Sequence, residues 1–544
     1  MILPYRAAIA ILAFGGPVCA QAPQAALDKG VTLSGTVINA VSTLPIEGIY
    51  TTLEGEDSER SYDATTDPSG HFAIKDITPG VYRLFGIGRG YALQEYGARG
   101  PRRWGKPIVL SSELSALNIR LPLLPSGILN GRIVDDNNNP VFPVAVDLLE
   151  KRPYLVSLTT VIVGTKEANR AGSYQFNSLF PGQYYLRVRR AVTKAGRVSP
   201  SEHAHDCLPS VLYYPAGSTL ESAVPVTVNG GFETDVGDLS MSAGRCFSMV
   251  VTVDSEGSSA TNVRLYLLPA AGSALPKDGL PLAVTTVSRG ESTVQFTELS
   301  PGTYLLIASL DAIDKSFNTK TITIADANVR GVAIAAMSTG KVMGHIELAG
   351  DTSAADWRFD DLRIKVTSVG VLGWRRDTTI DAKGAFELDN IGRGEYYIDL
   401  SGQPRDVVVK ALSVNGVVSP GRRFVHDGES SERMNILLCR CAGTVEGIAA
   451  DEEDKAPGIA TVVLVPPDVD GRIDRIHVAI ARADGTFSMP SVPAGHYRAF
   501  AWDDVQWGAY YEPTFLAAYV DQGKEIAVNP SVVTGVRLRI IHTK

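Results

Sequence analysis

The sequence predicts an all-β protein of five tandem immunoglobulin- or transthyretin-like β-sandwich domains that follow an N-terminal signal peptide. Two observations carry this prediction. A motif with the turns and alternation of short β-strands recurs at intervals of about one small domain. The composition, with 52 Gly and 31 Pro but 8% aromatic residues, suits many short strands and turns, and no segment has the apolar period of a long amphipathic helix. A chain of 544 residues is also too long for a single hydrophobic core.

The motif is clearest between Asp67 and Tyr82, where it reads DPSGHFAIKDITPGVY. Its second glycine recurs at positions 80, 182, 302, 394 and 495, which are 102, 120, 92 and 101 residues apart. A tyrosine follows two residues later in every copy, and another glycine lies ten residues earlier in every copy except the weaker third one. Spacings of this size are those of whole domains in tandem rather than of solenoid repeats.

Each copy of the motif predicts a strand, a turn and another strand. Asp67 followed three residues later by glycine suits a type I turn, because the carboxylate caps backbone amides and glycine tolerates a positive φ. Phe72 and Ile74 alternate with polar residues, which is the period of a half-buried strand. A Pro-Gly pair forms the next turn, and Tyr82 restarts the alternation. We therefore expect the motif residues to occupy turn and core positions, not catalytic ones.

The first residues have the pattern of a secretory signal. Arg6 precedes an apolar run, and small residues end at Ala20, after which we expect cleavage. Cys19 would suit a lipoprotein, but Val18 directly before it fits that signal poorly. We therefore expect a secreted, periplasmic or cell-surface protein. No later segment approaches about eighteen uninterrupted apolar residues, so we expect no transmembrane segment in the mature chain.

Five domains follow from the motif spacing, the glycine-rich strand that opens each unit and the alternating run that closes it. The predicted boundaries are 1–20 for the signal peptide and 30–123, 125–241, 242–338, 339–438 and 440–544 for the sandwiches. The linkers between them, such as 123–126, are short. Short linkers favour a stiff rod or a gently curved array over freely moving domains.

Charge and cysteine content narrow the class of protein. The formal charge is −8, and the leader holds one charged residue, Arg6, so the mature chain carries −8 − 1 = −9. A mildly acidic, evenly spread charge argues against a nucleic-acid partner, which needs a basic stripe. Of the four cysteines left after cleavage, we expect Cys207 to pair with Cys246. Cys439 and Cys441 would lie about 7 Å apart on a strand, at the edge of disulfide reach, and are either bridged or buried thiols.

The units resemble carboxypeptidase regulatory-like domains, the small prealbumin-like sandwich that occurs in many bacterial exported proteins. The residues that carry the resemblance are the opening Gly-x-Val/Ile strands, the Asp-x-x-Gly-x-Phe…Pro-Gly-x-Tyr core, and the segments 213–233 and 496–504. The resemblance covers nearly all of the mature chain. It implies a non-catalytic sandwich. We also expect no cofactor. Because the same fold group includes starch-binding-like modules, it also implies a capacity to bind carbohydrate.

Metal and catalytic motifs are sparse. His203, His205 and Cys207 form a metal-like cluster that could hold zinc on one face of a strand, and a polar loop with Cys207 in a disulfide is the simpler interpretation. The acidic stretches 135–139 and 468–474 could offer oxygens to calcium, but neither has EF-hand spacing and Asx-rich turns explain both. Collagen-adhesin B-type domains share the sandwich and carry a Lys–Asn crosslink; Lys341 and Asn435 are the one comparable pair, and we expect no crosslink.

A cluster of aromatic residues in the last unit is the candidate ligand-binding face. Exposed indole and phenol rings could stack on sugars or form a protein-binding patch. The simpler interpretation is that Trp502 packs in the core and that the segment after it covers the sandwich, because large aromatic side chains usually supply core area. The candidate binding residues are Trp502, Trp507, Tyr510, Tyr511 and Phe515.

The function predicted from the sequence is a non-catalytic, secreted or envelope-associated scaffold or binding protein whose partner is a polysaccharide or an envelope protein. The first alternative is a dedicated carbohydrate-binding protein that uses exposed aromatic residues of the fifth sandwich. The second alternative, an accessory to a metal-dependent hydrolase, would require a cleft that unites His203 and His205 with an acidic residue. Exposure of Trp502 and Trp507 distinguishes the first alternative from a plain scaffold.

Overall fold

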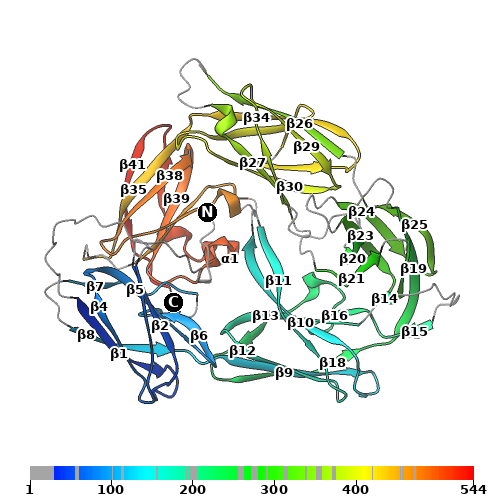
Figure 1. The fold of residues 1–544 in the computed structure, drawn as a ribbon, viewed down its shortest axis with the longest axis horizontal. Coiled ribbons are helices and arrows are strands. Elements are labelled where there is room, and N and C mark those ends of the chain that lie inside the picture. The colour runs from blue at the N-terminus through cyan, green and yellow to red at the C-terminus, as the bar shows by residue number, and fades with distance from the viewer. Residues whose placement is uncertain are drawn as a thin grey trace, which may run out of the picture.

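Each copy of the motif lies in its own β-sandwich, and the five sandwiches are built in the same way from two facing sheets (Figure 1). The computed structural model describes residues 30–543 apart from 56–59, 101, 112–115, 155–156, 191–192, 195–204, 255–261, 271–279, 289–291, 311–316, 337–339, 351–357, 370–374, 420, 454, 456–458 and 470–472. The predicted signal peptide lies outside the described residues. The all-β prediction is confirmed, since α1 (Pro513–Ala517) is the one α-helix in the described part of the chain. That part holds no helix long and apolar enough to cross a bilayer.

Sandwich 1 consists of β1 to β8. Its first sheet has the order β4-β1-β8, and its second sheet has the order β3-β2-β5-β6 with β7 also paired to β5. The strands are β1 (Val31–Asn39), β2 (Tyr50–Gly55), β3 (Ser61–Thr65), β4 (His71–Ile77), β5 (Gly80–Gly88), β6 (Tyr91–Glu95), β7 (Ile108–Leu110) and β8 (Ala116–Leu123).

Sandwich 2 has a first sheet of order β12-β9-β18 and a second sheet of order β11-β10-β13-β16 with β17 paired to β13. Its elements are β9 (Gly127–Asp135), β10 (Ala145–Tyr154), β11 (Ser157–Glu167), β12 (Ser173–Leu179), β13 (Gly182–Arg189), β16 (Val211–Tyr213), η1 (Leu220–Ser222), β17 (Val226–Val228) and β18 (Glu233–Met241).

Sandwich 3 has a first sheet of order β14-β22-β19-β15 with β25 also paired to β19, and a second sheet of order β21-β20-β23-β24. Its strands are β14 (Thr193–Lys194), β15 (His205–Cys207), β19 (Gly244–Asp254), β20 (Asn262–Ala270), β21 (Ala283–Ser288), β22 (Thr293–Leu299), β23 (Gly302–Leu310), β24 (Phe317–Ile324) and β25 (Val329–Ala335). The strands β14 and β15 belong in sequence to the second unit, so that unit donates two strands to the sheet of its neighbour.

Sandwich 4 has the sheet orders β29-β26-β34-β31-β32 and β28-β27-β30-β33. Its elements are β26 (Gly340–Leu348), η2 (Phe359–Asp361), β27 (Arg363–Ser368), β28 (Arg375–Thr379), β29 (Ala385–Ile391), β30 (Gly394–Ser401), β31 (Val408–Val414), β32 (Val417–Ser419), β33 (Arg423–His426) and β34 (Ser431–Cys439).

Sandwich 5 has the sheet orders β38-β35-β41 and β37-β36-β39-β40. Its elements are β35 (Ala442–Ala450), β36 (Thr461–Val465), η3 (Ile473–Arg475), β37 (His477–Ile480), β38 (Thr486–Pro493), β39 (Gly495–Trp502), η4 (Ala509–Tyr511), the helix α1, η5 (Val520–Gln522), β40 (Lys524–Val528) and β41 (Val533–Arg539).

One topology is shared by all five sandwiches. The opening strand pairs antiparallel with the first strand of the motif and parallel with the closing strand, as β1 does with β4 and β8. The same pairings recur for β9, β19, β26 and β35. Motif residues that the sequence assigned to the core are buried, among them Phe72, Ile74 and Tyr82.

The turn that the motif predicts is present. Oδ1 of Asp67 accepts hydrogen bonds from the backbone N–H groups of Ser69 (2.8 Å) and His71 (2.9 Å). Asn169 and Asp381 make the same pair of bonds in sandwiches 2 and 4. A short polar side chain therefore caps the turn that leads into the first strand of the motif.

The tyrosine of the motif anchors the second turn. In every sandwich its hydroxyl donates to the backbone carbonyl four residues earlier, an arrangement that resembles the tyrosine corner of immunoglobulin-like folds. The pairs are Tyr82 to Thr78 (2.6 Å), Tyr184 to Phe180 (2.7 Å), Tyr304 to Ser300 (2.6 Å), Tyr396 to Gly392 (2.7 Å) and Tyr497 to Pro493 (2.8 Å). The third copy keeps this bond although its sequence is the weakest match.

A bulge precedes the same turn. The residue before the last apolar position of the motif strand has a positive φ in every copy, and the register with the opening strand shifts there. These residues are Asp76 (φ 57), Ser178 (φ 60), Glu298 (φ 58), Asn390 (φ 56) and Ser491 (φ 60). The bulge adds a residue to the strand, which turns the next apolar side chain back into the core.

The sandwiches are arranged as a closed ring (Figure 1). The three-stranded sheets with β1, β9 and β35 and the larger sheets with β19 and β26 lie on the outside, and the sheets with β5, β13, β23, β30 and β39 face the interior. Sandwich 5 returns to sandwich 1, where the backbone N–H of Trp507 donates to the carbonyl of Arg102 at 2.9 Å. The rod or gently curved array expected from the short linkers is therefore wrong, because the joints bend consistently in one direction.

Candidate functional site

The predicted aromatic residues lie on the interior side of sandwich 5. The segment that holds η4, α1 and η5 connects β39 to β40 and covers the β37-β36-β39-β40 sheet. Trp502, at the end of β39, is fully buried beneath this segment. Its ring stacks on Phe500 with centroids 5.1 Å apart and contacts Phe515 (5.6 Å) and Tyr519 (5.8 Å). The cluster is a second small core that fastens the segment to the sheet.

Burial removes two of the five residues from the predicted binding face. Trp502 and Tyr510 have 0% and 2% of their surface exposed, so neither ring can stack on a ligand in this conformation. Burial raises the pKa of Tyr510, whose ring lies 4.7 Å from that of Tyr511. Tyr511 and Phe515 are half-buried. Trp507, with 46% of its surface exposed, is the tryptophan that remains accessible.

Trp507 lies where three sandwiches meet. Its backbone donates to Arg102 in the loop between β6 and β7 of sandwich 1. The next residue, Gly508, has a φ of 90, and a Cβ there would lie 3.4 Å from Cγ of Pro153 on β10. The hairpin of β10 and β11 from sandwich 2 crosses the ring toward α1 (Figure 1). The accessible indole therefore belongs to an inter-sandwich junction and not to an isolated platform.

The loop between β6 and β7 supplies the basic side of this junction. The Arg102 guanidinium forms an ion pair with Glu150 of β10, with one contact at 3.1 Å, and lies 5.8 Å from the ring centroid of Phe180. Glu150 also pairs with Arg152 at 3.1 Å. The loop is thereby attached to sandwich 2 as well as to its own sheet.

The carboxylate of Asp504 in sandwich 5 forms ion pairs with two other arginines of that loop. Its carboxylate lies 3.1 Å from Arg103 Nη1 and 3.5 Å from Arg99 Nε. Arg103 Nη1 also donates to the Asp504 carbonyl at 3.2 Å and to Thr543 Oγ1 at 3.5 Å. The side chain of Asp504 is 8% exposed, so a buried carboxylate meets two cations. This junction was not predicted from the sequence, in which three arginines within positions 99–103 were the available signal.

The two cysteine pairs are both bridged. Cys207 of β15 is joined to Cys246 of β19 with Cα atoms 5.8 Å apart, which is the pairing expected from the sequence. The bridge fixes a donated strand to sandwich 3. Cys439 and Cys441 are also joined, with Cα atoms 5.2 Å apart, closer than an extended strand would place them because β34 ends at Cys439 and β35 begins at Ala442.

The candidate metal ligands are not brought together in the described part of the chain. His203 lies outside the described residues, the backbone of His205 pairs with that of Cys246 on β19, and Cys207 is in a disulfide. No group of three potential metal ligands is found among the described residues. Asp135 caps its own turn, and the bonds from the side chain and backbone of Asn139 lower its pKa.

The two residues of the candidate crosslink have other neighbours. Lys341 pairs with Glu387 and Asp389 on β29 and lies opposite Ser431 on β34, while Asn435 lies opposite His345.

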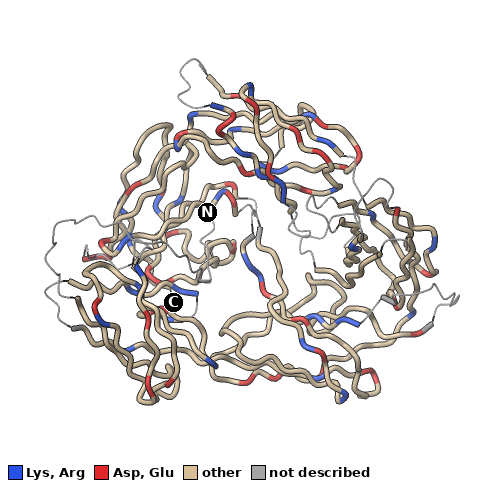
Figure 2. Tube along the Cα trace, in the orientation of Figure 1, with Lys and Arg blue, Asp and Glu red and all other residues tan. Residues whose placement is uncertain are grey.

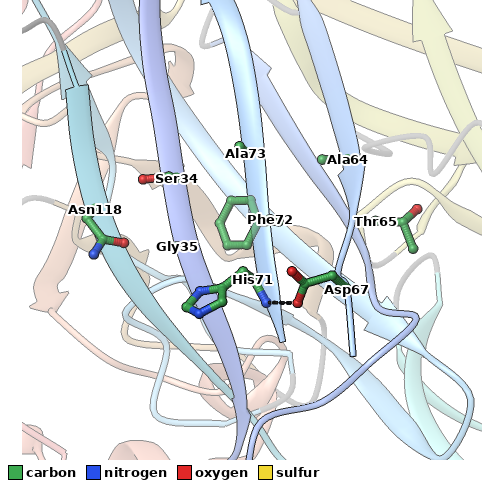
Figure 3. Close-up of a pocket in the computed structure, with 9 residues that line it drawn as sticks. All are labelled: Ser34, Gly35, Ala64, Thr65, Asp67, His71, Phe72, Ala73 and Asn118. Atoms are coloured by element: carbon green, nitrogen blue, oxygen red, sulfur yellow. Dashed lines mark hydrogen bonds between the residues drawn. The ribbon is translucent and has the colours of Figure 1, made fainter. Parts of the chain in front are cut away.

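An open depression of about 440 Å³ lies on sandwich 1 (Figure 3). It forms because Gly35 has no side chain above the ring of Phe72. Two of its polar groups are engaged in the sandwich itself, since Asp67 caps the motif turn and the ring of His71 is bonded to Thr36 Oγ1 at 2.9 Å. We therefore attribute the depression to strand packing.

Residues 32–108 match the family model described as the carboxypeptidase regulatory-like domain. This part of sandwich 1 includes the first copy of the motif, so the resemblance inferred from the sequence is confirmed there. No curated protein matches the chain.

Solved structures similar to this chain include two bacterial pilins and a bacterial collagen-binding protein. They include GBS52, the minor pilin of Streptococcus agalactiae, with 14% identity over 40% of this chain and 97% of that chain and a TM-score of 0.24. BcpA, the major pilin subunit of Bacillus cereus, has 11% identity over 75% and 99% and a TM-score of 0.14. Two B repeat units of the collagen-binding protein of Staphylococcus aureus have 10% identity over 76% and 100% and a TM-score of 0.14. At these TM-scores the similarities carry no functional argument.

Proposed function

We propose that the protein is a non-catalytic, exported scaffold whose five sandwiches, with the boundaries 30–123, 125–241, 242–338, 339–438 and 440–544, present binding surfaces from a defined ring. The observation that carries this proposal is that each sandwich is fastened to its neighbours by its own set of contacts. An array of independent binding modules would need no such contacts, whereas a scaffold that holds surfaces at fixed positions does.

The joints between sandwiches support this proposal. Sandwiches 3 and 4 share one hydrophobic cluster, in which the rings of Phe317 and Tyr396 lie 6.4 Å apart. Sandwiches 2 and 3 share Leu149, Tyr213 and Leu280 together with the donated strands. Burial of apolar surface between domains favours one fixed orientation over relative motion.

Surface charge is also consistent with a scaffold. Lysine and arginine alternate with aspartate and glutamate along all five sandwiches (Figure 2). Interspersed charge keeps an exported protein soluble without steering it to one kind of polyion. The partner proposed here is therefore an envelope protein that contacts several sandwiches at once.

A carbohydrate-binding role is the second candidate, and the exposure of Trp507 favours it. One accessible indole beside two half-buried rings offers a smaller stacking surface than five exposed aromatic residues would. We therefore expect weak glycan binding at this position, where a single ring supplies most of the contact area.

The experiment compares the two candidates with the same protein. The mature chain is tested on a glycan array and on insoluble polysaccharides, and in parallel is crosslinked to its neighbours on intact cells that export it. Crosslinks to a defined envelope protein from several sandwiches, without glycan retention, support the scaffold. Retention on a polysaccharide that is lost in Trp507→Ala supports the carbohydrate candidate. If neither crosslinks nor glycan retention is observed, both candidates are contradicted.

A further inference from the structure

The joint between sandwiches 1 and 5 differs in kind from the other joints of the ring. The chain itself connects every other neighbouring pair. A disulfide between Cys439 and Cys441 stands beside the link from sandwich 4 to sandwich 5, and an antiparallel bridge joins Tyr91 to Pro125 between sandwiches 1 and 2. Among the described residues, the contacts that close the ring between sandwich 5 and sandwich 1 are noncovalent. We call this joint the seam.

The described contacts across the seam are polar. They include the pairs of Asp504 with Arg99 and Arg103, the bonds from Arg103 to the carbonyl of Asp504 and to Thr543, and the backbone bond from Trp507 to Arg102. The hydrophobic clusters formed by the described residues of sandwich 1 and of sandwich 5 have no member in common. The joint between sandwiches 3 and 4, in contrast, has a shared hydrophobic cluster beside the bond from Thr319 to the carbonyl of Arg393 (3.5 Å).

When the seam separates, hydration of its charged groups replaces the attraction between them. In the closed ring Asp504 is shielded from water, and both of its carboxylate oxygens lack a hydrogen-bond partner within the geometry of a good bond. Arg99 is 63% exposed and Arg103 29% exposed. Separation would return one carboxylate and two guanidinium groups to water, which offsets the lost attraction because burying charges is itself unfavourable.

One part of the junction would stay in place. Arg102 holds the same loop to Glu150 of sandwich 2, which the chain keeps next to sandwich 1. Sandwich 5 would therefore leave as a unit, carrying Trp507 and the covering segment with it, and would also give up the close approach of Gly508 to Pro153 on β10. Its own aromatic cluster lies wholly within sandwich 5 and needs no support from sandwich 1.

We propose that the seam is an ionic latch, so that the ring has a closed state and an open state and ionic strength shifts the balance between them. Opening frees the backbone of Trp507 and the surfaces of Arg99, Arg103 and Asp504. Salt favours the open state because opening exposes Asp504 and both arginines, and ions screen exposed charges strongly, with a Debye length of about 3 Å at 1 M ionic strength. The closed contacts are screened less because Asp504 is buried there. The apolar joints do not weaken in this way.

The test measures the shape of the full mature chain by small-angle X-ray scattering at low and high salt. Asp504→Asn keeps the side-chain shape and removes the charge that both arginines face. We expect the variant at low salt, and the native chain at high salt, to gain maximum dimension on the order of one sandwich diameter, roughly 30 Å. The matched control is Asp238→Asn, which removes the exposed pair with Arg132 (2.7 Å) in sandwich 2 and leaves the seam intact.

A second variant guards against local unfolding of sandwich 5. Arg103→Gln acts from the other side of the seam and leaves the covering segment untouched. The fluorescence of buried Trp502, measured in a chain whose other four tryptophans are replaced by phenylalanine, reports whether sandwich 5 stays folded. Expansion in both variants with unchanged Trp502 emission supports the latch. Unchanged dimensions in both variants and across the salt series would overturn it, as would expansion in Asp238→Asn alone.

Discussion

Gly35 on β1 lies directly opposite Phe72 on β4, and a Cβ at Gly35 would stand 2.7 Å from the Phe72 ring. Sandwiches 2, 4 and 5 repeat this cross-strand pairing of a glycine with an aromatic residue. The pairs are Gly131 with Tyr174, Gly344 with Phe386 and Gly447 with Phe487. In sandwich 3 two valines, Val251 and Val294, take the same places. Sandwich 3 thus fills the two positions with two side chains of medium size, whereas the other sandwiches use a glycine and an aromatic ring.

The first prediction concerns this pairing. Gly447→Ala would place a methyl group 2.9 Å from the Phe487 ring and against the carbonyl of Val536, so the ring or the strand must shift. We expect a loss of about 1–3 kcal/mol in the free energy of unfolding, as for other overpacked cores. Denaturant unfolding of the full chain measures it. Gly535→Ala is the control, since a Cβ there meets no atom within 4 Å; equal effects of both substitutions would contradict the packing argument.

The sequence predicted the repeated motif, its turns and its buried alternation because those features are local. Asp67 and Tyr82 each bond to residues no more than four positions away. The glycine of the opening strand was recognised as a recurring feature, but its aromatic partner lies on another strand and was assigned to the core independently. A pairing across strands follows from register, which a local pattern does not specify.

The ring was not predicted because its contacts are remote in sequence. Arg103 and Asp504 are 401 residues apart, and each alone reads as an ordinary charged residue of a loop. The same holds for the candidate site. Nothing in the local sequence distinguishes Trp502 from Trp507, but Trp502 is buried under the covering segment and Trp507 is half-exposed just before η4. Composition identifies an aromatic segment, whereas tertiary packing decides which of its rings is accessible.

The second prediction uses the buried tyrosine hydroxyls. Burial raises the pKa of Tyr304 and of Tyr497 to about 12, against about 10 in the unfolded chain. Between these values the unfolded state has lost protons that the folded state keeps, so stability falls as pH rises from about 10 to about 12. Thermal unfolding at a series of alkaline pH values measures the fall. Tyr304→Phe should make it shallower, and an unchanged slope in that variant would contradict the assignment.

The third prediction concerns the buried ion pair of sandwich 2. Asp147 and Arg187 are 0% and 1% exposed and lie 2.7 Å apart, and Arg189 approaches the same carboxylate at 2.8 Å. Burial alone would raise the pKa of Asp147, but the two arginines outweigh it and lower that pKa. Arg187→Met leaves the carboxylate short of a buried partner and should cost about 3–5 kcal/mol in unfolding free energy.

The matched control for that pair is the double variant Asp147→Leu with Arg187→Met. Replacing both partners by apolar residues of similar volume removes the buried charge together with its counter-charge, so we expect most of the lost stability to return. Since the folded-state pKa of Asp147 is depressed, its contribution is present above the unfolded value of about 3.9 and is lost as pH falls through the folded value. A double variant as unstable as Arg187→Met would show that packing, and not charge, dominates.

The fourth prediction compares the two disulfides. In the chain-entropy description a bridge stabilises according to the length of the loop it closes, which is 39 residues for Cys207–Cys246 and 2 residues for Cys439–Cys441. Replacing the first pair by serine should cost about 4 kcal/mol and the second about 1 kcal/mol. Denaturant unfolding of the two double variants gives both values. A larger loss from the short loop would assign that bridge a role in fixing the joint between sandwiches 4 and 5.

The last prediction separates the two tryptophans of sandwich 5. Trp502→Ala empties the centre of the aromatic cluster beneath the covering segment and should cost about 3–5 kcal/mol, as for other buried aromatic truncations. Trp507→Ala removes a half-exposed ring and should change stability by less than about 1 kcal/mol. In chains that keep one of these two residues as the single tryptophan, acrylamide should quench the fluorescence of Trp507 and spare that of Trp502. If the two tryptophans are quenched equally, the covering segment leaves the sheet in solution, and all five aromatic residues return to consideration as a binding face.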